Sequence, residues 1–431
     1  MSENRRDFLR RSALPGVMLQ AGGGRSEGKP IRVGFVGVGG RGSHHLDILL
    51  AMDGVEIKAL CDVDDGNLYR AKHWVEQAGK PAPALYSRGK TDYLRLCDRD
   101  DIDLVIHSTP WEYHAPACIA AMKTGKHTAT EVPAAITIDE CWEMVETSEK
   151  TGKHCTMLEQ ANYSEAGLAA LNMAQQGVLG ELLHASGGYV HDLRLVKFDP
   201  AREPWRLQHS IDRNGNLYPT HPMGPMAWWL NINRGDKIEY LVSMSTKAKT
   251  LNEYAAHHYG ERHPYAKVKM ALGDVNTTLL ATADGKTITL HHDTNTPHPQ
   301  TSELRLQGTK GLYAGNIGKV YLEGRSPKPH EWEPFDKYLA EYQHPIWKNF
   351  DQEKSKTARG HGGGATTPML WQRLLHALRT GGPLDQDVYD AVTWSVISPL
   401  TQRSVAAKSR PVDFPDFTRG KWKTTPPIKL N

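Results

Sequence analysis

Short apolar runs alternate with amphipathic helical segments over the first third of the chain. The runs are rich in Val, Ile and Leu, and most are followed by a stretch with helical periodicity. Strict alternation of this kind predicts a parallel, doubly wound sheet, because helices must carry the chain back between parallel strands. We therefore predict an α/β domain over residues 31–157, with strands at 31–36, 55–62, 101–110, 127–132 and 154–160.

The pattern changes near residue 160, where glycines and aromatic residues become frequent. Two β-rich runs flank Asp284-Gly285, which is a strong hairpin signal, and further strand-like runs follow over 301–324. Strands without intervening helices indicate an open, mainly antiparallel sheet. Two C-terminal segments, 366–381 and 387–408, have the periodicity of amphipathic helices. We predict a second, α+β domain over residues 158–431.

The composition excludes several classes of protein. The 431 residues carry 52 basic and 49 acidic side chains, so neither nucleic acid nor an anionic membrane is indicated as a partner. No apolar run approaches the roughly 18 residues of a membrane-spanning helix. The five cysteines are scattered, and no metal-ligand cluster stands out, so we expect buried thiols and no metal site.

The first thirty residues do not read as part of the folded domains. Arg5-Arg6, followed by Asp7-Phe8-Leu9, resembles a twin-arginine export signal. The expected location is then periplasmic or extracellular. The alternative is a disordered basic tail, in which case the protein stays in the cytoplasm.

A glycine motif joins the first strand to the first helix. Gly37-x-Gly39-x-x-Gly42 has the strand before it and the helix after it that a dinucleotide-binding loop requires. Asp62 ends the second strand, where an acid accepts hydrogen bonds from a ribose and repels a 2′-phosphate. The sequence therefore predicts a Rossmann domain that prefers NAD over NADP. Ligands of such sheets bind beyond the strand C-termini, where Trp111–His114, Glu131 and Glu159-Gln160 should gather.

The stretch "YPTHP" at 218–222 places a tyrosine and a histidine between prolines. Proline has no N–H and a fixed φ, so we expect a stiff irregular segment, neither a helix interior nor a central strand.

Several longer motifs carry a family resemblance. "PWEYH", "EVPAAIT", "GGYVHDLR" and "RNGNLYPTH" are similar to glycoside hydrolase family 109, the NAD-dependent branch of the Gfo/Idh/MocA oxidoreductases typified by α-N-acetylgalactosaminidase. The resemblance extends over nearly all of residues 31–431. It implies a Rossmann domain followed by an open-sheet substrate domain, and a carbohydrate substrate. The resemblance is also compatible with a homo-oligomer.

The resemblance also assigns site residues. Most dehydrogenases of the superfamily carry Glu-Lys-Pro, whereas this chain has Glu131-Val132-Pro133, as the hydrolase branch does. Acid–base chemistry is therefore expected from Tyr218 and His221, with His191 as an auxiliary. Substrate contacts are expected from Tyr189, Arg206, Tyr218, Pro219, Thr220 and His221. NAD contacts are expected from Gly37, Gly39, Arg41, Gly42, Asp62, Trp111, Glu112, Tyr113, His114, Glu131, Val132 and Gln160.

Some of these assignments have alternatives. His114 could be a helix-start residue whose hydrogen bonds are already made, and we interpret His361 as part of a glycine-rich loop. Gln160 stands where the hydrolase branch has Asn. Loops expected to face the substrate also depart from the family pattern, which puts the sugar and its N-acetyl group in doubt.

The resemblance implies a cycle without net oxidation. C3 of the sugar is oxidised, the aglycone is eliminated, water adds, and the hydride returns, so NAD must stay tightly bound and be recycled in each turnover. One alternative is a sugar or inositol dehydrogenase that releases NADH. Another is a non-catalytic binding protein with a vestigial Rossmann domain.

Overall fold

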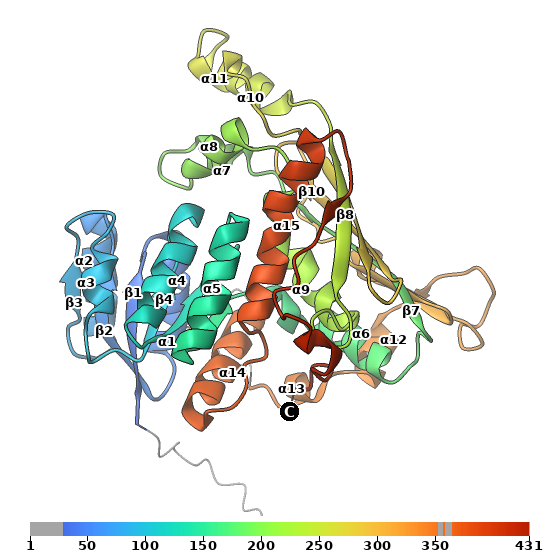
Figure 1. The fold of residues 1–431 in the computed structure, drawn as a ribbon, viewed down its shortest axis with the longest axis horizontal. Helices are drawn as coiled ribbons and strands as arrows, with labels where there is room; N and C mark the ends of the chain where they lie inside the picture. The colour runs from blue at the N-terminus through green and yellow to red at the C-terminus, as the bar shows by residue number, and fades with distance from the viewer. Residues whose placement is uncertain (1–28, 352–356, 358–363, 431) are drawn as a thin grey trace, which may run out of the picture.

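Two sheets lie on opposite sides of a group of helices (Figure 1). The structure is a computed structural model, and it describes residues 29–351, 357 and 364–430. The export signal predicted in residues 1–30 therefore falls almost wholly outside the described residues, as does His361.

The N-terminal sheet has six parallel strands in the order β3-β2-β1-β4-β5-β6. This is the doubly wound order of a Rossmann fold, and it confirms the predicted class. The sheet is buried on both faces, which is why its strands are nearly continuous apolar runs. The strands are β1 (Ile31–Val36), β2 (Val55–Cys61), β3 (Ala84–Tyr86), β4 (Leu104–His107), β5 (His127–Thr130) and β6 (Cys155–Met157).

Helices connect these strands. Strand β3 was not among the five predicted strands, because a run of three residues is too short to show a period. Helix α2 has Asp64 as its N-cap, and α5 ends at Gly152, whose φ is +66°. The five helices are α1 (Gly40–Leu50), α2 (Asp65–Gln77), α3 (Tyr93–Cys97), α4 (His114–Lys123) and α5 (Ile138–Thr151); two 3₁₀ turns, η2 (Trp111–Tyr113) and η3 (Gln160–Tyr163), follow β4 and β6.

The second sheet has nine strands in the order β14-β13-β12-β11-β7-β10-β9-β8-β15. All neighbours are antiparallel except β7 and β10, so the sheet is mixed and mainly antiparallel, as predicted. The hairpin expected at Asp284-Gly285 joins β9 to β10. The strands are β7 (Leu182–Val190), β8 (Ile238–Ser245), β9 (Asn276–Thr282), β10 (Thr287–Asp293), β11 (Arg305–Gly308), β12 (Gly311–Ala314), β13 (Lys319–Leu322), β14 (Glu333–Pro334) and β15 (Val412–Asp413).

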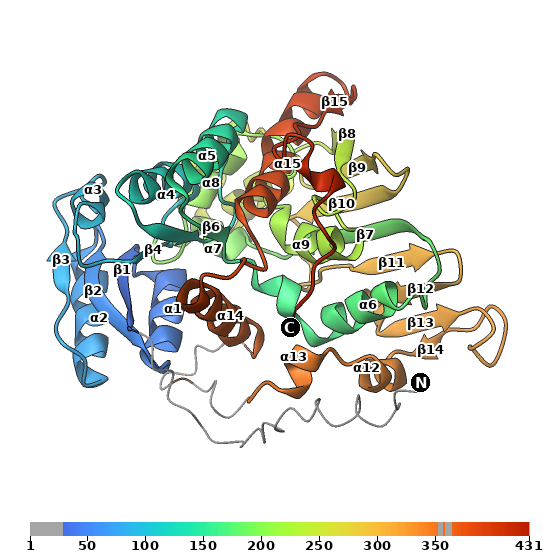
Figure 2. The ribbon, with the colours of Figure 1, turned by 60° about the horizontal axis from the view of Figure 1, so that its bottom comes forward.

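Helices cover one face of this sheet, α9 against β7 and α15 against β8 (Figures 1 and 2). The opposite face exposes apolar side chains, among them Met244 and Leu279. The remaining helices are α6 (Glu165–Gln175), α7 (Arg194–Phe198), α8 (Trp205–Asp212), α9 (Thr220–Trp229), α10 (Thr250–Tyr259), α11 (Pro264–Lys267), α12 (Asp336–Glu341), α13 (Pro345–Lys348), α14 (Thr366–Thr380) and α15 (Val388–Ala406); η4 (Gly315–Ile317) and η6 (Lys421–Lys423) are 3₁₀ turns.

The two C-terminal helices return to the Rossmann domain. Helix α15 packs against α5 and β6, and α14 lies beside α1 (Figure 2). The Oγ of Ser395 in α15 accepts the backbone N–H of Ala134 at 2.9 Å, and Trp371 in α14 bonds His45 in α1. The end of the chain thus joins the two sheets into one body.

The cysteines and the helix lengths can be compared with the sequence-based expectations. All five cysteines are buried and free. No helix in the described residues is long and apolar enough to cross a membrane.

The expectation that "YPTHP" is an irregular segment is wrong for its second half. Pro219 is the N-cap of α9, and Thr220, His221 and Pro222 form its first turn. Prolines are tolerated there because the first backbone N–H groups of a helix have no partner within it.

Candidate functional site

The glycine loop lies directly against the end of β4. Gly37 has a φ of +83°, and a Cβ on it would lie 2.5 Å from the carbonyl oxygen of Ser108. A Cβ on Gly42 would lie 2.0 Å from the carbonyl oxygen of Gly37, whereas one on Gly39 would meet only the amide of Asn67, at 3.1 Å. Larger residues at 37 and 42 would therefore separate the loop from the sheet. The free N–H groups at the start of α1 suit a pyrophosphate.

Asp62 is anchored at the end of β2. Its Oδ2 accepts the backbone N–H of Val38 in the glycine loop at 2.8 Å, and its Oδ1 accepts the N–H of Asp64 at 2.9 Å. The carboxylate is therefore held beside the loop, in the position where an acid bonds ribose hydroxyls and disfavours a 2′-phosphate.

Unpaired polar atoms gather at the same edge of the sheet. The Oγ of Ser108 and Oγ1 of Thr109 follow β4, and Oε1 of Gln160 follows β6. All three atoms are buried without a hydrogen bond from the described residues. Buried polar atoms are normally paired, so these atoms fit a polar ligand in this crevice. Together with the loop and Asp62, they fit NAD.

Glu131, another expected NAD contact, forms a buried network with Arg41 and His45. Its Oε1 lies 3.0 Å from Nε of Arg41 and 2.6 Å from Nε2 of His45. Nδ1 of His45 accepts the indole N–H of Trp371 at 2.9 Å, so the neutral ring carries its hydrogen on Nε2 and donates it to Glu131. Arg41, an expected NAD contact, is thus oriented by a chain of bonds that begins in α14.

Burial and charge oppose each other in this network. Burial raises the pKa of Glu131, but the hydrogen bond from His45 and the charge of Arg41 outweigh it and hold the pKa well below its ordinary value. Burial also lowers the pKa of His45, despite its carboxylate partner. The network therefore contains one carboxylate, one guanidinium and a neutral imidazole.

The other expected NAD contacts differ in their burial and in their hydrogen-bond partners. Trp111 is buried, whereas Glu112 is exposed and lies 3.6 Å from His209. His114 is buried, with Nδ1 2.7 Å from the carbonyl of Pro133 and Nε2 2.7 Å from that of Thr109. Both ring nitrogens therefore have partners, as expected if His114 is a helix-start residue whose hydrogen bonds are already made. Tyr113 is half-buried, and Val132 is 2% exposed, with its N–H bonded to Glu131.

Four of the residues expected to act on the substrate form one aromatic cluster. The rings of Tyr218 and His221 are 5.1 Å apart, and that of Tyr189 is 4.6 Å from Tyr218 and 5.4 Å from His221. Trp111 stacks on Tyr218 at 5.5 Å. The guanidinium of Arg206 lies over both of those rings, at 5.0 and 5.1 Å. The cluster joins the end of β4 to the start of α9.

The phenols of this cluster are held neutral. Burial raises the pKa of Tyr218 well above its usual value, and Arg206 offsets only part of that effect. The pKa of Tyr189 is raised for the same reason. His191 lies at the edge, with Nδ1 3.4 Å from the hydroxyl of Tyr189, and burial lowers its pKa. Pro219 and Thr220 are buried, and Oγ1 of Thr220 has no hydrogen-bond partner among the described residues.

Two features near the cluster were missed by sequence reasoning. Nδ1 of His221 lies 2.7 Å from Oε1 of Glu159, which is fully buried. Lys197 and His292 line a small cavity behind Tyr189 and Tyr218. In each feature the two residues are far apart in the chain, and no sequence motif links them.

Lys197 is a buried amine that forms no ion pair with a carboxylate of the described residues. Its Nζ donates to Oγ1 of Thr294 at 2.9 Å and to Oδ1 of Asn295 at 2.6 Å. Burial, helped by the charge of Arg206, lowers the pKa of Lys197 to about 7. Burial also lowers the pKa of the neighbouring His292, to about 3.

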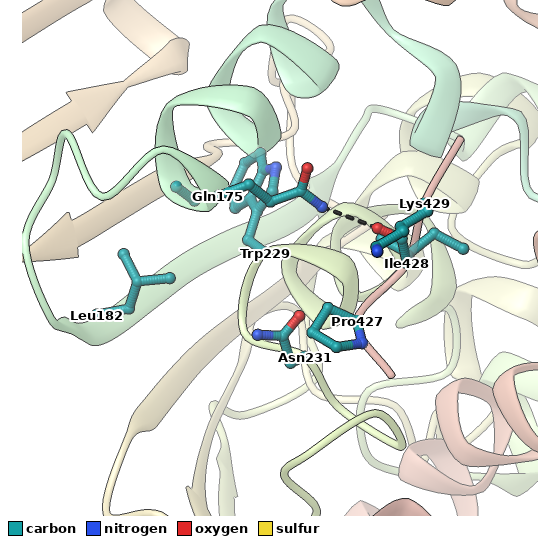
Figure 3. Close-up of a pocket in the computed structure, with 8 residues that line it drawn as sticks. Gln175, Leu182, Trp229, Asn231, Pro427, Ile428 and Lys429 are labelled. Atoms are coloured by element: carbon teal, nitrogen blue, oxygen red, sulfur yellow. Dashed lines mark hydrogen bonds between the residues drawn. The ribbon is translucent and has the colours of Figure 1, made fainter. Parts of the chain in front are cut away.

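A separate, open groove of about 390 Å³ lies between α6, the start of β7 and the C-terminal tail (Figure 3). The amide of Gln175 donates to the carbonyl of Ile428 across it, at 2.9 Å. None of its lining residues is a predicted site residue. As for metals, the described part of the chain contains no group of three or more His, Cys, Asp or Glu side chains that could hold an ion.

Comparison with solved structures shows the fold. Levoglucosan dehydrogenase in complex with NADH and levoglucosan matches with a TM-score of 0.67 and 21% identity, over 90% of this chain and 100% of that one. The WlbA dehydrogenase from Bordetella pertussis, in complex with NADH and UDP-GlcNAcA, matches with a TM-score of 0.65 and 15% identity, over 90% and 99%.

Sequence comparison shows the family. Residues 31–159 match the model of the oxidoreductase family with an NAD-binding Rossmann fold, and residues 163–424 match the model of the glycosyl hydrolase 109 C-terminal domain. A glycosyl hydrolase family 109 protein of Shewanella pealeana is 46% identical over 93% of this chain and 88% of its own length. One of Shewanella baltica is 44% identical over the same shares. Two matching domain models and relatives of this identity place the chain in glycosyl hydrolase family 109, on a Gfo/Idh/MocA-type NAD-binding fold.

Proposed function

We propose that the protein is a glycosidase that uses NAD without net oxidation, with terminal α-N-acetylgalactosaminides as its first candidate substrates. The single observation that carries the proposal is the cluster of Tyr218, His221, Tyr189 and Arg206 at the mouth of an NAD-type crevice. A glycosidase of the ordinary two-carboxylate kind would need a carboxylic acid on each side of the scissile bond. The cluster instead supplies phenols, an imidazole and a guanidinium.

The crevice supplies the means to hold NAD. The start of α1, Asp62, Ser108 and Gln160 would hold it, because these are the unpaired or anchored polar groups along the strand ends. When bound there, NAD would supply reversible hydride acceptance at C3 of the sugar, which acidifies the hydrogen on C2.

The remaining steps are proton transfers that the chain's own residues can perform. His221 is half-buried, and an imidazole held at this edge suits a base that removes the C2 proton. Tyr218 has a neutral phenol beside Arg206, which suits a group that donates a proton to the leaving oxygen. Removal of the C2 proton to His221 and departure of the protonated aglycone from C1 would leave an enone, to which water would add at C1. Return of the hydride from NAD would then restore C3.

The position of Val132 supports the assignment of the proton transfers to His221 and Tyr218. Its side chain is buried among apolar neighbours at the end of β5, and it carries no titratable group. We therefore assign proton transfer at the sugar to Tyr218, just before α9, and His221, in its first turn.

A panel of nitrophenyl glycosides tests the proposal, with purified protein and no added NAD. We expect release of nitrophenol, with the α-N-acetylgalactosaminide among the cleaved substrates, and exchange of the C2 hydrogen for solvent deuterium. A nicotinamide absorbance that co-purifies with the protein would support tight binding. Steady formation of NADH from free sugars and added NAD, with no glycoside cleaved, would instead establish a dehydrogenase.

We also propose export by the twin-arginine route, on the strength of Arg5-Arg6 in the N-terminal segment. That route carries folded proteins, so NAD bound in the cytoplasm would travel with the enzyme. Cell fractionation of the wild type and of an Arg5→Lys/Arg6→Lys variant tests it: equal cytoplasmic retention of both would refute export.

A further inference from the structure

Glu159 and His221 form a buried pair that joins the two domains. Oε1 of Glu159 lies 2.7 Å from Nδ1 of His221, and the side chain of Glu159 is 0% exposed whereas that of His221 is 20% exposed. Glu159 follows β6, at the edge of the Rossmann sheet where the cofactor site lies. His221 is in the first turn of α9, beside the other sheet.

The bond sets the tautomer of His221. Oε1 of Glu159 also accepts the backbone N–H of Ala161 at 3.1 Å, so it acts as an acceptor toward both neighbours. The hydrogen between the pair therefore resides on Nδ1 of His221. In the neutral ring Nε2 is then unprotonated, and none of the described residues bonds it.

The close approach of α9 is possible because residue 224 is glycine. A Cβ at Gly224 would lie 3.0 Å from Cγ of Glu159 and 2.2 Å from Oδ1 of Asn162. Gly224 is one turn after His221 on the helix. The missing side chain thus lets the imidazole reach the carboxylate.

We propose that Glu159 is a positioning residue that holds His221 with Nε2 free to accept a proton from the substrate. The proposal rests on the function proposed above, since it concerns the same proton transfer. The logic is that of any imidazole base oriented by a buried carboxylate, in which the carboxylate fixes the ring and stabilises the imidazolium that forms.

The central variant is Glu159→Gln, which keeps the size of the side chain but can donate from its amide to Nδ1. We expect kcat to fall about 100- to 10,000-fold, with KM changed less than about threefold, because the wrong tautomer removes the base but not the binding surface. Bound nicotinamide should be unchanged. Glu303→Gln is the matched control, since Glu303 pairs with Nδ1 of His291 at 2.8 Å on the substrate-domain sheet, outside the cluster. That control should keep the wild-type kcat.

A double variant separates positioning from general damage. If Glu159 acts through His221, then Glu159→Gln combined with His221→Ala should be no slower than His221→Ala alone, within about threefold. Losses that multiply would overturn the proposal, as would a Glu159→Gln enzyme with wild-type kcat.

Nitrogen NMR of ¹⁵N-histidine-labelled protein gives a readout that needs no substrate. With His221→Ala as the assignment control, we expect His221 to show a protonated Nδ1 in the wild type and a changed tautomer in Glu159→Gln. If no glycoside is cleaved by the wild type, the proposed function fails, and this spectrum still decides the role of Glu159. An unchanged tautomer would overturn it.

Discussion

Lys197 should make the free energy of unfolding depend on pH, and the substitution Lys197→Met should remove that dependence. The residue is 3% exposed, its amine donates to Thr294 and Asn295, and burial lowers its pKa from 10.5 to about 7. Arg206 lowers it further, whereas Asp293 and more distant acids oppose the shift. The unfolded chain binds a proton at this residue between the two pKa values and the folded chain does not, so stability rises with pH in that window.

The magnitude follows from the same two values. Each pH unit at which the two states differ by one proton is worth about 1.36 kcal/mol. Integrating between pH 7.5 and 9.5, with pKa values of about 7 and 10.5, gives a gain of about 2.5 kcal/mol from Lys197 alone. Lys197→Met removes that gain. It also leaves two buried oxygens unpaired, at about 1–3 kcal/mol each, but this loss does not vary with pH.

Urea unfolding at pH 7.5, 8.5 and 9.5 measures the effect as the difference between wild type and variant. The difference should grow by about 2.5 kcal/mol across the series. Lys286→Met is the matched control, because Lys286 contacts Asp236 and Asp284 and its pKa is raised, so it stays protonated throughout. Its difference from the wild type should be constant. Parallel curves for Lys197→Met and the wild type would refute the reasoning.

Three further changes test the cofactor crevice and its support. Gly42→Ala places a Cβ 2.0 Å from the carbonyl oxygen of Gly37, so we expect the purified variant to retain no nicotinamide, as judged by absorbance and acid release. Asp62→Ser removes the charge beside the ribose site, and the preference for NAD over NADP should fall in a binding titration. Trp371→Phe leaves Nδ1 of His45 unpaired and should cost about 1–3 kcal/mol by urea unfolding; an unchanged midpoint would contradict the network.

The Rossmann half could be predicted because its signals are local. Strand and helix periods, the glycine motif and the acid at the end of the second strand lie within short windows, and each needs only its immediate neighbours to be interpreted. The structure bears these out in five of the six strands and in the anchoring of Asp62, whereas the three-residue β3 was missed. The predicted hairpin at Asp284-Gly285 is confirmed for the same reason, because its signal is also local.

The start of α9 could not be predicted in this way. Prolines 219 and 222 indicate an irregular segment when only local conformation is considered, yet the start of a helix accepts both, one at the N-cap and one in the first turn. Whether a helix continues from that turn depends on its packing, and α9 is buried almost all round, from Met223 to Trp229.

The sequence by itself determined the two kinds of sheet, the family and the residue types available for acid–base work, because these follow from periodicity and from motifs of a few residues. Only the tertiary structure decided which partners those residues have. Glu159 and His221 are 62 positions apart, and their bond depends on the gap that Gly224 leaves. Lys197 is buried in a cavity that residues of α8 and β10 also line, and its partners Thr294 and Asn295 are 97 and 98 positions away in the sequence. Contacts of this kind arise when distant elements pack, and no short stretch of sequence records them.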